Sequence, residues 1–373
     1  MSRPATARIN LDAIRHNYRT AKALTPGARA VAVVKANGYG HGAIAIARAL
    51  ALDADAFAVA CIEEALELRD SGIVRPILLL EGVFEPDELA LVDSAGLTPV
   101  IHTRQQLDWL LRARPSRPLD VWLKMDTGMH RVGLAPDSFA TAHRDLDQCQ
   151  HVAGIVLMSH LARADELDSD ATKRQLDCFL QHVGAIDAPR SLANSAAVLA
   201  WPATHGDWVR PGIMLYGATP LTAPHPHAER LRPTMCLESA LISTRELAAG
   251  EPIGYGARFV CERPTRVGVV AMGYADGYPR HARDGTPVAV KGQPSRIIGR
   301  VSMDMLTVDL SAIPDARSGD PVQLWGDQVA ANEVAAASDT IAYQLFTGIS
   351  RRVPLRYANA ASAPAGAADA SQD

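Results

Sequence analysis

The sequence lacks the features that mark disulfide-rich, zinc-binding and membrane-spanning proteins. Its five cysteines are odd in number and scattered, without a CxxC pair, which argues against a disulfide framework and a structural zinc site. The N-terminal stretch MSRPATARIN has no apolar core of a signal peptide. The most apolar stretch, 42–52, is interrupted by Arg48 and is too short to span a membrane. We therefore expect a cytoplasmic protein in a reducing compartment, with no membrane partner and no bound metal.

The chain also lacks an excess of charge of either sign. A net charge of −4 gives no electrostatic basis for binding nucleic acid. The content of 48% hydrophobic and 21% charged residues is typical of a globular protein. A length of 373 residues is sufficient for one large domain or two ordinary ones.

From about Arg8 to Arg232, short apolar segments alternate with amphipathic segments such as 62–71, 104–113 and 165–185. Eight strands joined by helical segments predict a (β/α)8 barrel. An open doubly wound sheet is the alternative, but no GxGxxG motif follows the first strand, which weakens it. The strand candidates are 31–34, 56–60, 77–80, 98–101, 120–124, 152–158, 190–193 and 207–209.

After Arg232 the pattern changes to short strand-like pieces separated by turns rich in Gly, Pro and Asp. This pattern predicts an all-β second domain. We predict a barrel over 1–232, of which the first ~10 residues can pair with the second domain. The second domain covers 233–357 and leaves 358–373, rich in Ala and Ser without periodicity, as a disordered tail.

Lys35 is the most informative residue of the chain. It ends the apolar run AVAVV and begins the glycine-rich turn ANGYGHG. Parallel barrels keep their chemistry where a strand opens into its loop, and an amine shielded from water there can be deprotonated and form a Schiff base with a carbonyl. The alternative is a surface lysine at a strand end, which is the commoner case.

Other polar residues follow the later strands, so we expect a ring of polar and cationic groups at one mouth of the barrel. The loops after the last two strands often bind phosphate through backbone N–H groups and a hydroxyl, which suits Ser195, Gly212 and Ile213, with Tyr39 reaching from the first loop. A Schiff-base lysine beside a phosphate site favours pyridoxal phosphate as the cofactor. The ring comprises Lys35, Lys124, Asp126, Arg131, His160, Asn194, Ser195, Arg210, Gly212 and Ile213.

In these residues the chain resembles the alanine racemase family, over nearly its whole length. The matching segments are, in order, AVVKANGYGHG, KMDTGMHRVG, the serine of LANSAA, VRPGIMLYG, PIGYGARF, GYADGYPR, GRVSMDM and ISRRVP. The first is the family's signature around the cofactor lysine. The resemblance implies a homodimeric isomerase that uses pyridoxal phosphate to interconvert L-alanine and D-alanine, in peptidoglycan precursor synthesis or in catabolism.

The resemblance also implies a role for each matching residue. Lys35 would bind the cofactor and act as the base for D-alanine, and Tyr255 of the partner subunit would act on L-alanine. Met303, also from the partner subunit, and Arg131 would meet the substrate carboxylate. Lys124 corresponds to a lysine that is carbamylated in many members. The residues implied to bind the cofactor are Lys35, Tyr39, His160, Asn194, Ser195, Arg210, which would face the pyridine nitrogen, Gly212, Ile213 and Arg351.

Three positions depart from the family's usual pattern. Arg351 stands where many members have a tyrosine that binds the cofactor phosphate, His130 where glycine is common, and Leu161 where phenylalanine is common. Two other functions remain open. One is a broad-specificity or serine-accepting amino-acid racemase, and the other is a non-catalytic pyridoxal-phosphate homeostasis protein, which would lack the β domain and any counterpart of Tyr255.

Overall fold

The computed structural model describes residues 3–358, which form two compact units. The barrel unit consists of Ile14–Arg232 and Ile341–Gly348, and the β unit contains the other described residues. The tail predicted over 358–373 lies outside the described residues apart from Ala358. All five cysteines are free. No helix in the described part of the chain is long and apolar enough to cross a membrane.

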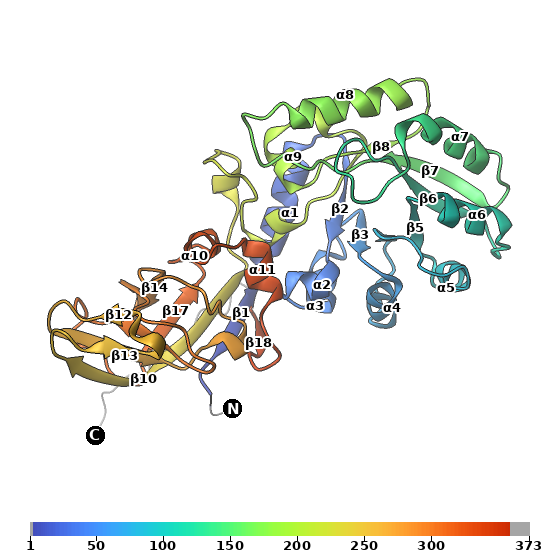
Figure 1. Cartoon of the computed structure of the whole chain (residues 1–373). Helices are drawn as coiled ribbons and strands as arrows, with labels where there is room; N and C mark the ends of the chain where they lie inside the picture. The colour runs from blue at the N-terminus through green and yellow to red at the C-terminus, as the bar shows by residue number, and fades with distance from the viewer. Residues whose placement is uncertain (1–2, 359–373) are drawn as a thin grey trace. The chain divides into compact units, whose positions relative to one another are not determined.

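The barrel unit contains eight parallel strands in the order β8-β7-β6-β5-β4-β3-β2-β9 (Figure 1). The sheet closes on itself through backbone hydrogen bonds from Asp207 N to Arg190 O, at 3.0 Å, and from Arg210 N to Ala193 O, at 2.9 Å. This confirms the predicted (β/α)8 barrel and excludes the open sheet. The strands are β2 (Arg29–Val33), β3 (Ala56–Val59), β4 (Ile77–Leu79), β5 (Thr98–Ile101), β6 (Leu119–Lys124), β7 (Val152–Met158), β8 (Arg190–Ser191) and β9 (Trp208–Val209).

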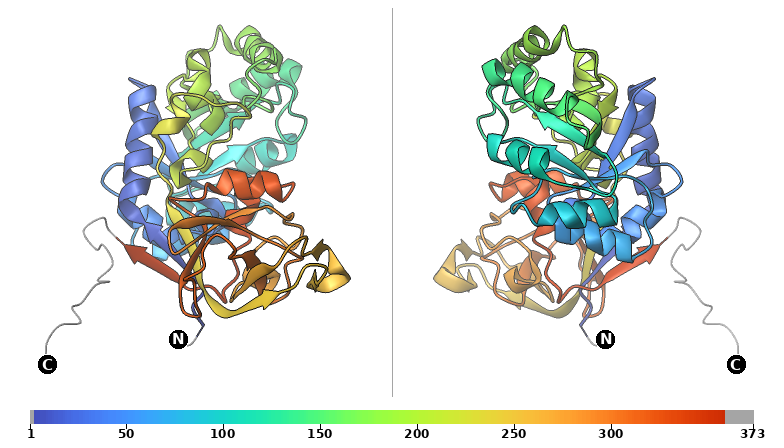
Figure 2. Two further views of the ribbon diagram at one scale, coloured as in Figure 1. Left: turned by 90° about the vertical axis from the view of Figure 1, so that its left-hand side faces the viewer. Right: turned by 90° about the vertical axis from the view of Figure 1, so that its right-hand side faces the viewer.

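Helices cover the outer side of these strands (Figure 2). Their sequences explain their place: α6 has a buried apolar stripe that includes Leu107 and Leu110, and the Thr103 hydroxyl caps its first turn by accepting from Gln106 N. These helices are α1 (Leu11–Leu24), α3 (Ala43–Leu50), α4 (Ile62–Asp70), α5 (Glu88–Ala95), α6 (Arg104–Arg112), α7 (Pro136–Asp147), α8 (Ala171–Val183) and α9 (Ser195–Ala200). Two further helices, α2 (Lys35–Tyr39) and α11 (Ala342–Thr347), line a cavity at the carboxyl ends of the strands.

The two-residue period of the strands carries specific side chains into the barrel. Along β2, Val31 lines a cavity at one end of the barrel, and Val33 and Lys35 line a second cavity. Alternate residues of a strand face the same side, so Lys35 is the next inward-facing residue after Val33. The strand therefore aims the lysine into the barrel mouth at its carboxyl end.

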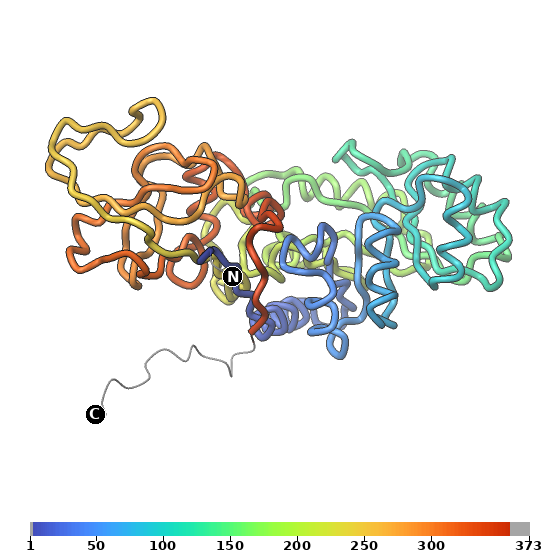
Figure 3. The backbone as a smooth tube through the Cα atoms, turned by 90° about the horizontal axis from the view of Figure 1, so that it is seen from below, coloured from blue at the N-terminus to red at the C-terminus, as the bar shows by residue number. Residues whose placement is uncertain are grey.

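The β unit is built around a sheet in which the first and last strands of the described chain lie side by side (Figure 3). Strand β1 (Thr6–Asn10) pairs antiparallel with β10 (Met235–Leu247) and parallel with β18 (Leu355–Ala358). The unit also contains helix α10 (Ala331–Ala337), so it is β-rich with one helix added to the expected strands. The other strands are β11 (Pro252–Ile253), β12 (Phe259–Val260), β13 (Thr265–Val270), β14 (Pro287–Val290), β15 (Gln293–Arg296), β16 (Leu306–Asp309) and β17 (Pro321–Trp325).

Candidate active site

The loop that begins at Lys35 has an unusual backbone. Three residues other than glycine, Ala36, Asn37 and Tyr39, adopt φ values of 52°, 52° and 51°, in the left-handed region that is costly for side chains with a Cβ. Side chains hold this conformation: Glu64 accepts from Ala36 N at 2.6 Å, and Asn37 Oδ1 accepts from Ala43 N at 2.9 Å. Strain of this kind persists where the surroundings enforce it, as at functional sites.

The structure explains why position 40 of this turn is a glycine. Its φ is 77°, and a Cβ built on it would lie 2.1 Å from the carbonyl oxygen of Phe346 in α11. Only glycine permits both this conformation and this close approach. The turn is thereby packed against α11, which the chain reaches only after passing through the β unit.

The Lys35 amine has a lowered pKa. Burial disfavours the charged form, and the neighbouring Arg131 guanidinium lowers the pKa further, whereas Glu81 and Glu64 oppose the shift. A lysine in this environment reaches its neutral, nucleophilic form at a lower pH than an exposed lysine. Lys35 is half-buried, unlike the exposed lysine that the alternative supposes.

A cavity of about 320 Å³ lies at the carboxyl ends of the barrel strands. It brings together nine of the residues singled out in the sequence, whereas Lys124 is buried and does not line it. Every lining residue belongs to the barrel unit. The lining comprises Val33, Lys35, Ala36, Tyr39, Leu80, Arg131, His160, Asn194, Ser195, Arg210, Gly212, Ile213, Tyr343 and Thr347.

One wall of the cavity is formed by hydroxyls and backbone N–H groups. Ser195 Oγ accepts two backbone hydrogen bonds, from Gly212 N at 2.8 Å and from Met214 N at 3.3 Å. A Cβ on Gly212 would lie 2.6 Å from the Tyr39 hydroxyl oxygen, so glycine leaves the space that this hydroxyl occupies. Burial raises the pKa of Tyr39 to about 12, which keeps its hydroxyl a hydrogen-bond donor.

Tyr343 and Thr347 of α11 line the same cavity, and sequence reasoning missed both. The Tyr343 ring lies 5.9 Å from the Tyr39 ring, and burial raises the pKa of its hydroxyl, which therefore stays protonated. Arg351, which the sequence suggested for the phosphate, is exposed and lies in the β unit. A tyrosine is present in the cavity where the sequence pattern suggested an arginine.

Arg210 is buried among acceptors that fix its orientation. Nη1 donates to Ser191 Oγ at 2.5 Å, and Nη2 donates to Ser159 O at 2.7 Å. Within residues 3–358, Nε of Arg210 makes no hydrogen bond. Burial lowers the pKa of Arg210 to about 10, so the guanidinium remains charged near neutral pH.

Burial and the neighbouring Arg210 set the protonation state of His160. Nη2 of Arg210 lies 3.4 Å from His160 Nδ1, and because a guanidinium N–H can only donate, Nδ1 is the acceptor. Burial, and then the charge of Arg210, place the pKa of His160 well below its usual range. His160 is therefore a neutral imidazole.

The loop that carries Arg131 is organised by Asp126. Its Oδ1 accepts from the backbone N–H groups of Gly128, Met129 and His130 at 3.0–3.1 Å. Burial disfavours the Asp126 carboxylate, but the hydrogen bonds from Gly128 and His130 lower its pKa overall. His130 has a φ of 55°, which explains why glycine suits this position, and its Nδ1 lies 3.1 Å from Asp126 Oδ2. Leu161, another departure from the pattern, is buried.

Tyr255 and Met303 lie in the β unit and are 69% and 52% exposed, unusually high for large apolar side chains. The loop that carries Met303 packs against the short 3₁₀ turn Tyr274–Asp276: Tyr274 N donates to Ser302 O and Ala275 N to Met303 O, both at 3.0 Å. A Cβ on Gly273 would lie 2.3 Å from Met303 O, so this position requires glycine.

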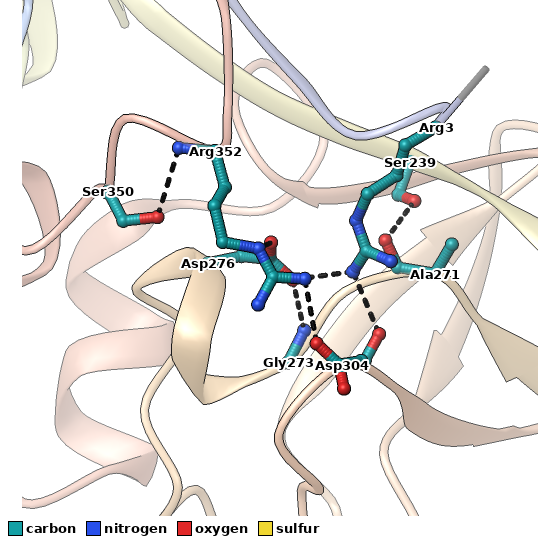
Figure 4. A network of polar contacts seen from close by, with 8 residues as sticks. All are labelled: Arg3, Ser239, Ala271, Gly273, Asp276, Asp304, Ser350 and Arg352. Carbon is teal, nitrogen blue, oxygen red and sulfur yellow. Dashed lines mark hydrogen bonds and ion pairs between the residues drawn. The ribbon is translucent and has the colours of Figure 1, made fainter.

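A buried carboxylate secures the same loop (Figure 4). Asp276 has no exposed surface and accepts from Arg3 at 2.7 Å and from Gly273 N at 2.9 Å. Arg352 lies 3.3 Å from Asp276 and pairs with Asp304, the residue after Met303, at 2.7 Å. The exposed Met303 is thus held on a braced loop.

The barrel mouth joins a lysine of lowered pKa to a group of hydroxyls and backbone N–H groups, an arrangement suited to amine–carbonyl chemistry beside a bound anion. Residues 9–220 match the family model "Alanine racemase, N-terminal domain", and residues 234–357 match "Alanine racemase, C-terminal domain". The chain belongs to the alanine racemase family.

Individual relatives agree over nearly the whole chain. The chain is 58% identical over 355 residues to "Alanine racemase" of Pseudomonas syringae, which covers 95% of this chain and 99% of that protein. It is 57% identical over 358 residues to "Alanine racemase, catabolic" of Pseudomonas aeruginosa, with 96% and 100% covered. The crystal structure of the biosynthetic alanine racemase of Pseudomonas aeruginosa matches with a TM-score of 0.93 at 51% identity, covering 96% of this chain and 100% of that one.

Proposed function

We propose that the protein interconverts L-alanine and D-alanine with pyridoxal phosphate, using Lys35 and the partner subunit's copy of Tyr255 as two bases. The observation that carries the proposal is the position of Lys35, whose pKa is lowered and which lines a cavity together with hydroxyl and backbone groups suited to a phosphate. The names of the relatives support alanine as the substrate. We further propose a cytoplasmic enzyme that supplies D-alanine for peptidoglycan or consumes it.

The cavity fits the cofactor in its donor set and its size. The hydroxyls of Tyr39, Ser195 and Tyr343 and the backbone N–H groups of Gly212 and Ile213 suit a phosphate. Lys35 suits an aldehyde, and a volume of about 320 Å³ suits a small cofactor with a small substrate. Pyridoxal phosphate supplies a carbonyl that combines with amines and a ring that withdraws electrons from the substrate's Cα.

Racemisation needs proton removal on one face of Cα and proton delivery on the other, hence two acid–base groups. An amine and a phenol ordinarily ionise near pH ~10, so each must be tuned to work near neutrality. The pKa of Lys35 is shifted in the direction that this tuning requires for one face. Tyr255 is proposed for the other face, near the positive charge of Arg131 and Arg210.

Arg210 is proposed to face the pyridine nitrogen through Nε, the guanidinium nitrogen that its protein partners leave available. A guanidinium does not readily release its proton, so it leaves that nitrogen unprotonated. This favours simple proton transfer at Cα over transamination. His160 positions Arg210, and Arg131 with the Met303 backbone is proposed to bind the substrate carboxylate.

Lys124 is proposed to be carbamylated. It is 6% exposed, and burial, followed by the charges of Arg210, Arg131 and Lys35, lowers its pKa to about 8. Because its pKa is far below that of an ordinary lysine, a much larger fraction of this amine is neutral near physiological pH and can react with CO₂, and the resulting anion would pair with Arg131.

The β unit is proposed to complete the site of a second copy of the chain. Tyr255 and Met303 are exposed on one chain although the reaction requires both, which is the arrangement expected of a homodimer with composite sites. A non-catalytic homeostasis function has no use for Tyr255, and we do not favour it.

An amino-acid panel tests the substrate and the two-base mechanism together. The cofactor-loaded protein is incubated with each L-amino acid in deuterated water, and Cα exchange and the D-enantiomer are measured. We expect turnover of alanine, and its loss together with the cofactor's visible absorption band in Lys35→Ala. Equal turnover of many amino acids would instead establish a broad-specificity racemase, and turnover of alanine and serine a serine-accepting one.

A further inference from the structure

We propose that His102 is a positioning residue whose Nδ1 accepts a hydrogen bond from Nζ of Lys124 and so fixes that amine at the barrel mouth. Only the consequence of this contact, the alignment of Lys124 with Arg131, rests on the proposed function. The juxtaposition itself follows from the strand register and from the hydrogen-bond partners of the two side chains.

The register of β5 and β6 places the two residues side by side. Val100 pairs with Trp122 and Ile101 with Leu123, so His102 follows beside Lys124. The Trp122 ring lies 5.7 Å from the ring of Trp208 in β9, a strand that does not neighbour β6 in the sheet, so Trp122 faces into the barrel. Thr98 of β5 lines a cavity at the other end of the barrel together with Asp120 and Trp122. His102 and Lys124 continue these two inward-facing series.

The tautomer of His102 follows from its neighbours. Nε2 lies 2.8 Å from the carbonyl oxygen of Glu81, which can only accept, so Nε2 carries the hydrogen. The Gln106 amide does not supply that hydrogen, because its N–H groups already point at the carbonyls of Glu81 and Val83, at 3.1 and 3.0 Å. The other ring nitrogen, Nδ1, is therefore a bare acceptor in the neutral ring.

This acceptor is buried and has no hydrogen-bond partner among the described residues. A buried polar atom without a partner costs free energy comparable to a lost hydrogen bond, so each such atom calls for an explanation. Burial lowers the pKa of His102, and the charge of Lys124 lowers it further, whereas the Glu81 carboxylate opposes the shift. The lone pair on Nδ1 thus remains available near neutral pH.

Lys124 presents the complementary group. Within residues 3–358 its Nζ makes no hydrogen bond or ion pair, although the side chain is buried among the cations Arg210, Arg131 and Lys35, with Asp126 as the opposing charge. The lysine stem has four rotatable bonds and can adopt several rotamers, and the proposed contact requires one that turns Nζ toward Nδ1. An amine, an ammonium and a carbamate nitrogen each keep at least one N–H, so the contact serves all three forms of Lys124.

Two substitutions separate the two ring nitrogens. His102→Asn places an oxygen near the position of Nδ1 and gives up the bond to Glu81, whereas His102→Gln keeps a donor for Glu81 and loses the acceptor. The chain has five lysines, so protein labelled with ¹³C-lysine gives few side-chain signals, and Lys124→Arg identifies the one from Lys124. The cofactor-loaded proteins are titrated in buffer purged of CO₂, without substrate, so the result does not depend on racemase activity.

We expect His102→Gln to lower the pKa of Lys124 by about 1, a tenfold change in its protonation equilibrium, because an acceptor stabilises the ammonium form. His102→Asn should leave this pKa close to that of the unaltered protein. A merely structural role predicts the opposite direction, since loosened packing admits water and raises the pKa of a buried lysine. An unchanged or raised pKa in His102→Gln, or equal shifts in the two variants, overturns the proposal.

Discussion

At the scale of single residues, the capacity of the cavity to donate hydrogen bonds depends on hydroxyl groups that burial keeps protonated. Tyr39 and Tyr343 approach from opposite ends of the barrel unit's sequence, and burial raises the pKa of both phenols, so each donates rather than ionises. Ser195 accepts from Gly212 N and Met214 N in the same wall. The phosphate affinity of the site should therefore depend on individual hydroxyls.

Tyr343→Phe should weaken cofactor binding by about 10-fold or more, since a hydrogen bond to a charged group contributes roughly 1.5–3 kcal/mol. Arg351→Ala is the matched control, because Arg351 was expected from sequence at this position but does not line the cavity. Titration of the apoprotein with pyridoxal phosphate, followed by absorbance, measures both. If Arg351→Ala lost more affinity for pyridoxal phosphate than Tyr343→Phe, the arginine rather than the tyrosine would be the residue that contacts the phosphate.

Lys124 gives the unfolding free energy a defined pH dependence. Its pKa is about 8 in the folded chain and ~10.4 in an unfolded one, so between these values the unfolded chain binds the extra proton. The unfolding free energy of the protein relative to Lys124→Met should therefore rise as the pH increases from 8 toward ~10.4. Urea denaturation of both proteins at pH 7.5 and pH 10, in CO₂-free buffer, measures this, and an equal difference at the two pH values would contradict it.

At the scale of elements, the strands were predictable and the return of α11 was not. Short β-branched runs bounded by Gly and Pro located all eight barrel strands to within a few residues, because buried parallel strands need such runs. The end of the first strand then placed Lys35, and the later loops placed Ser195 and Gly212. Tyr343 was missed because α11 follows the β unit in sequence but packs in the barrel unit, a tertiary contact that no local pattern specifies.

The loop of Met303 offers a test at the same scale. Arg352→Met removes the ion pairs to Asp276 and Asp304, while Arg351→Met changes the neighbouring arginine outside that network. We expect Arg352→Met to lower the unfolding free energy by about 1–3 kcal/mol, because the buried Asp276 carboxylate keeps only part of its partners. Chemical denaturation measures the difference, and similar losses in the two variants would show that the network does not brace the loop.

At the scale of the whole molecule, one chain does not place all the required groups in a single described cavity. The lysine and the phosphate-binding groups lie in the barrel unit, whereas Tyr255 and Met303 are exposed on the β unit. The proposed answer is a dimer in which each β unit serves the partner's barrel. The central claim is therefore that Lys35 and Tyr255 act together from different chains.

Mixing two inactive variants tests this claim most directly. Lys35→Ala and Tyr255→Phe are each assayed alone for alanine racemisation, then unfolded together, refolded and assayed again. If the two bases come from different chains, half of the dimers are hybrids with one intact site of two, and activity returns to about a quarter of the unaltered level. If both bases acted within one chain, no hybrid would contain an intact site, and a mixture as inactive as its components would contradict the account.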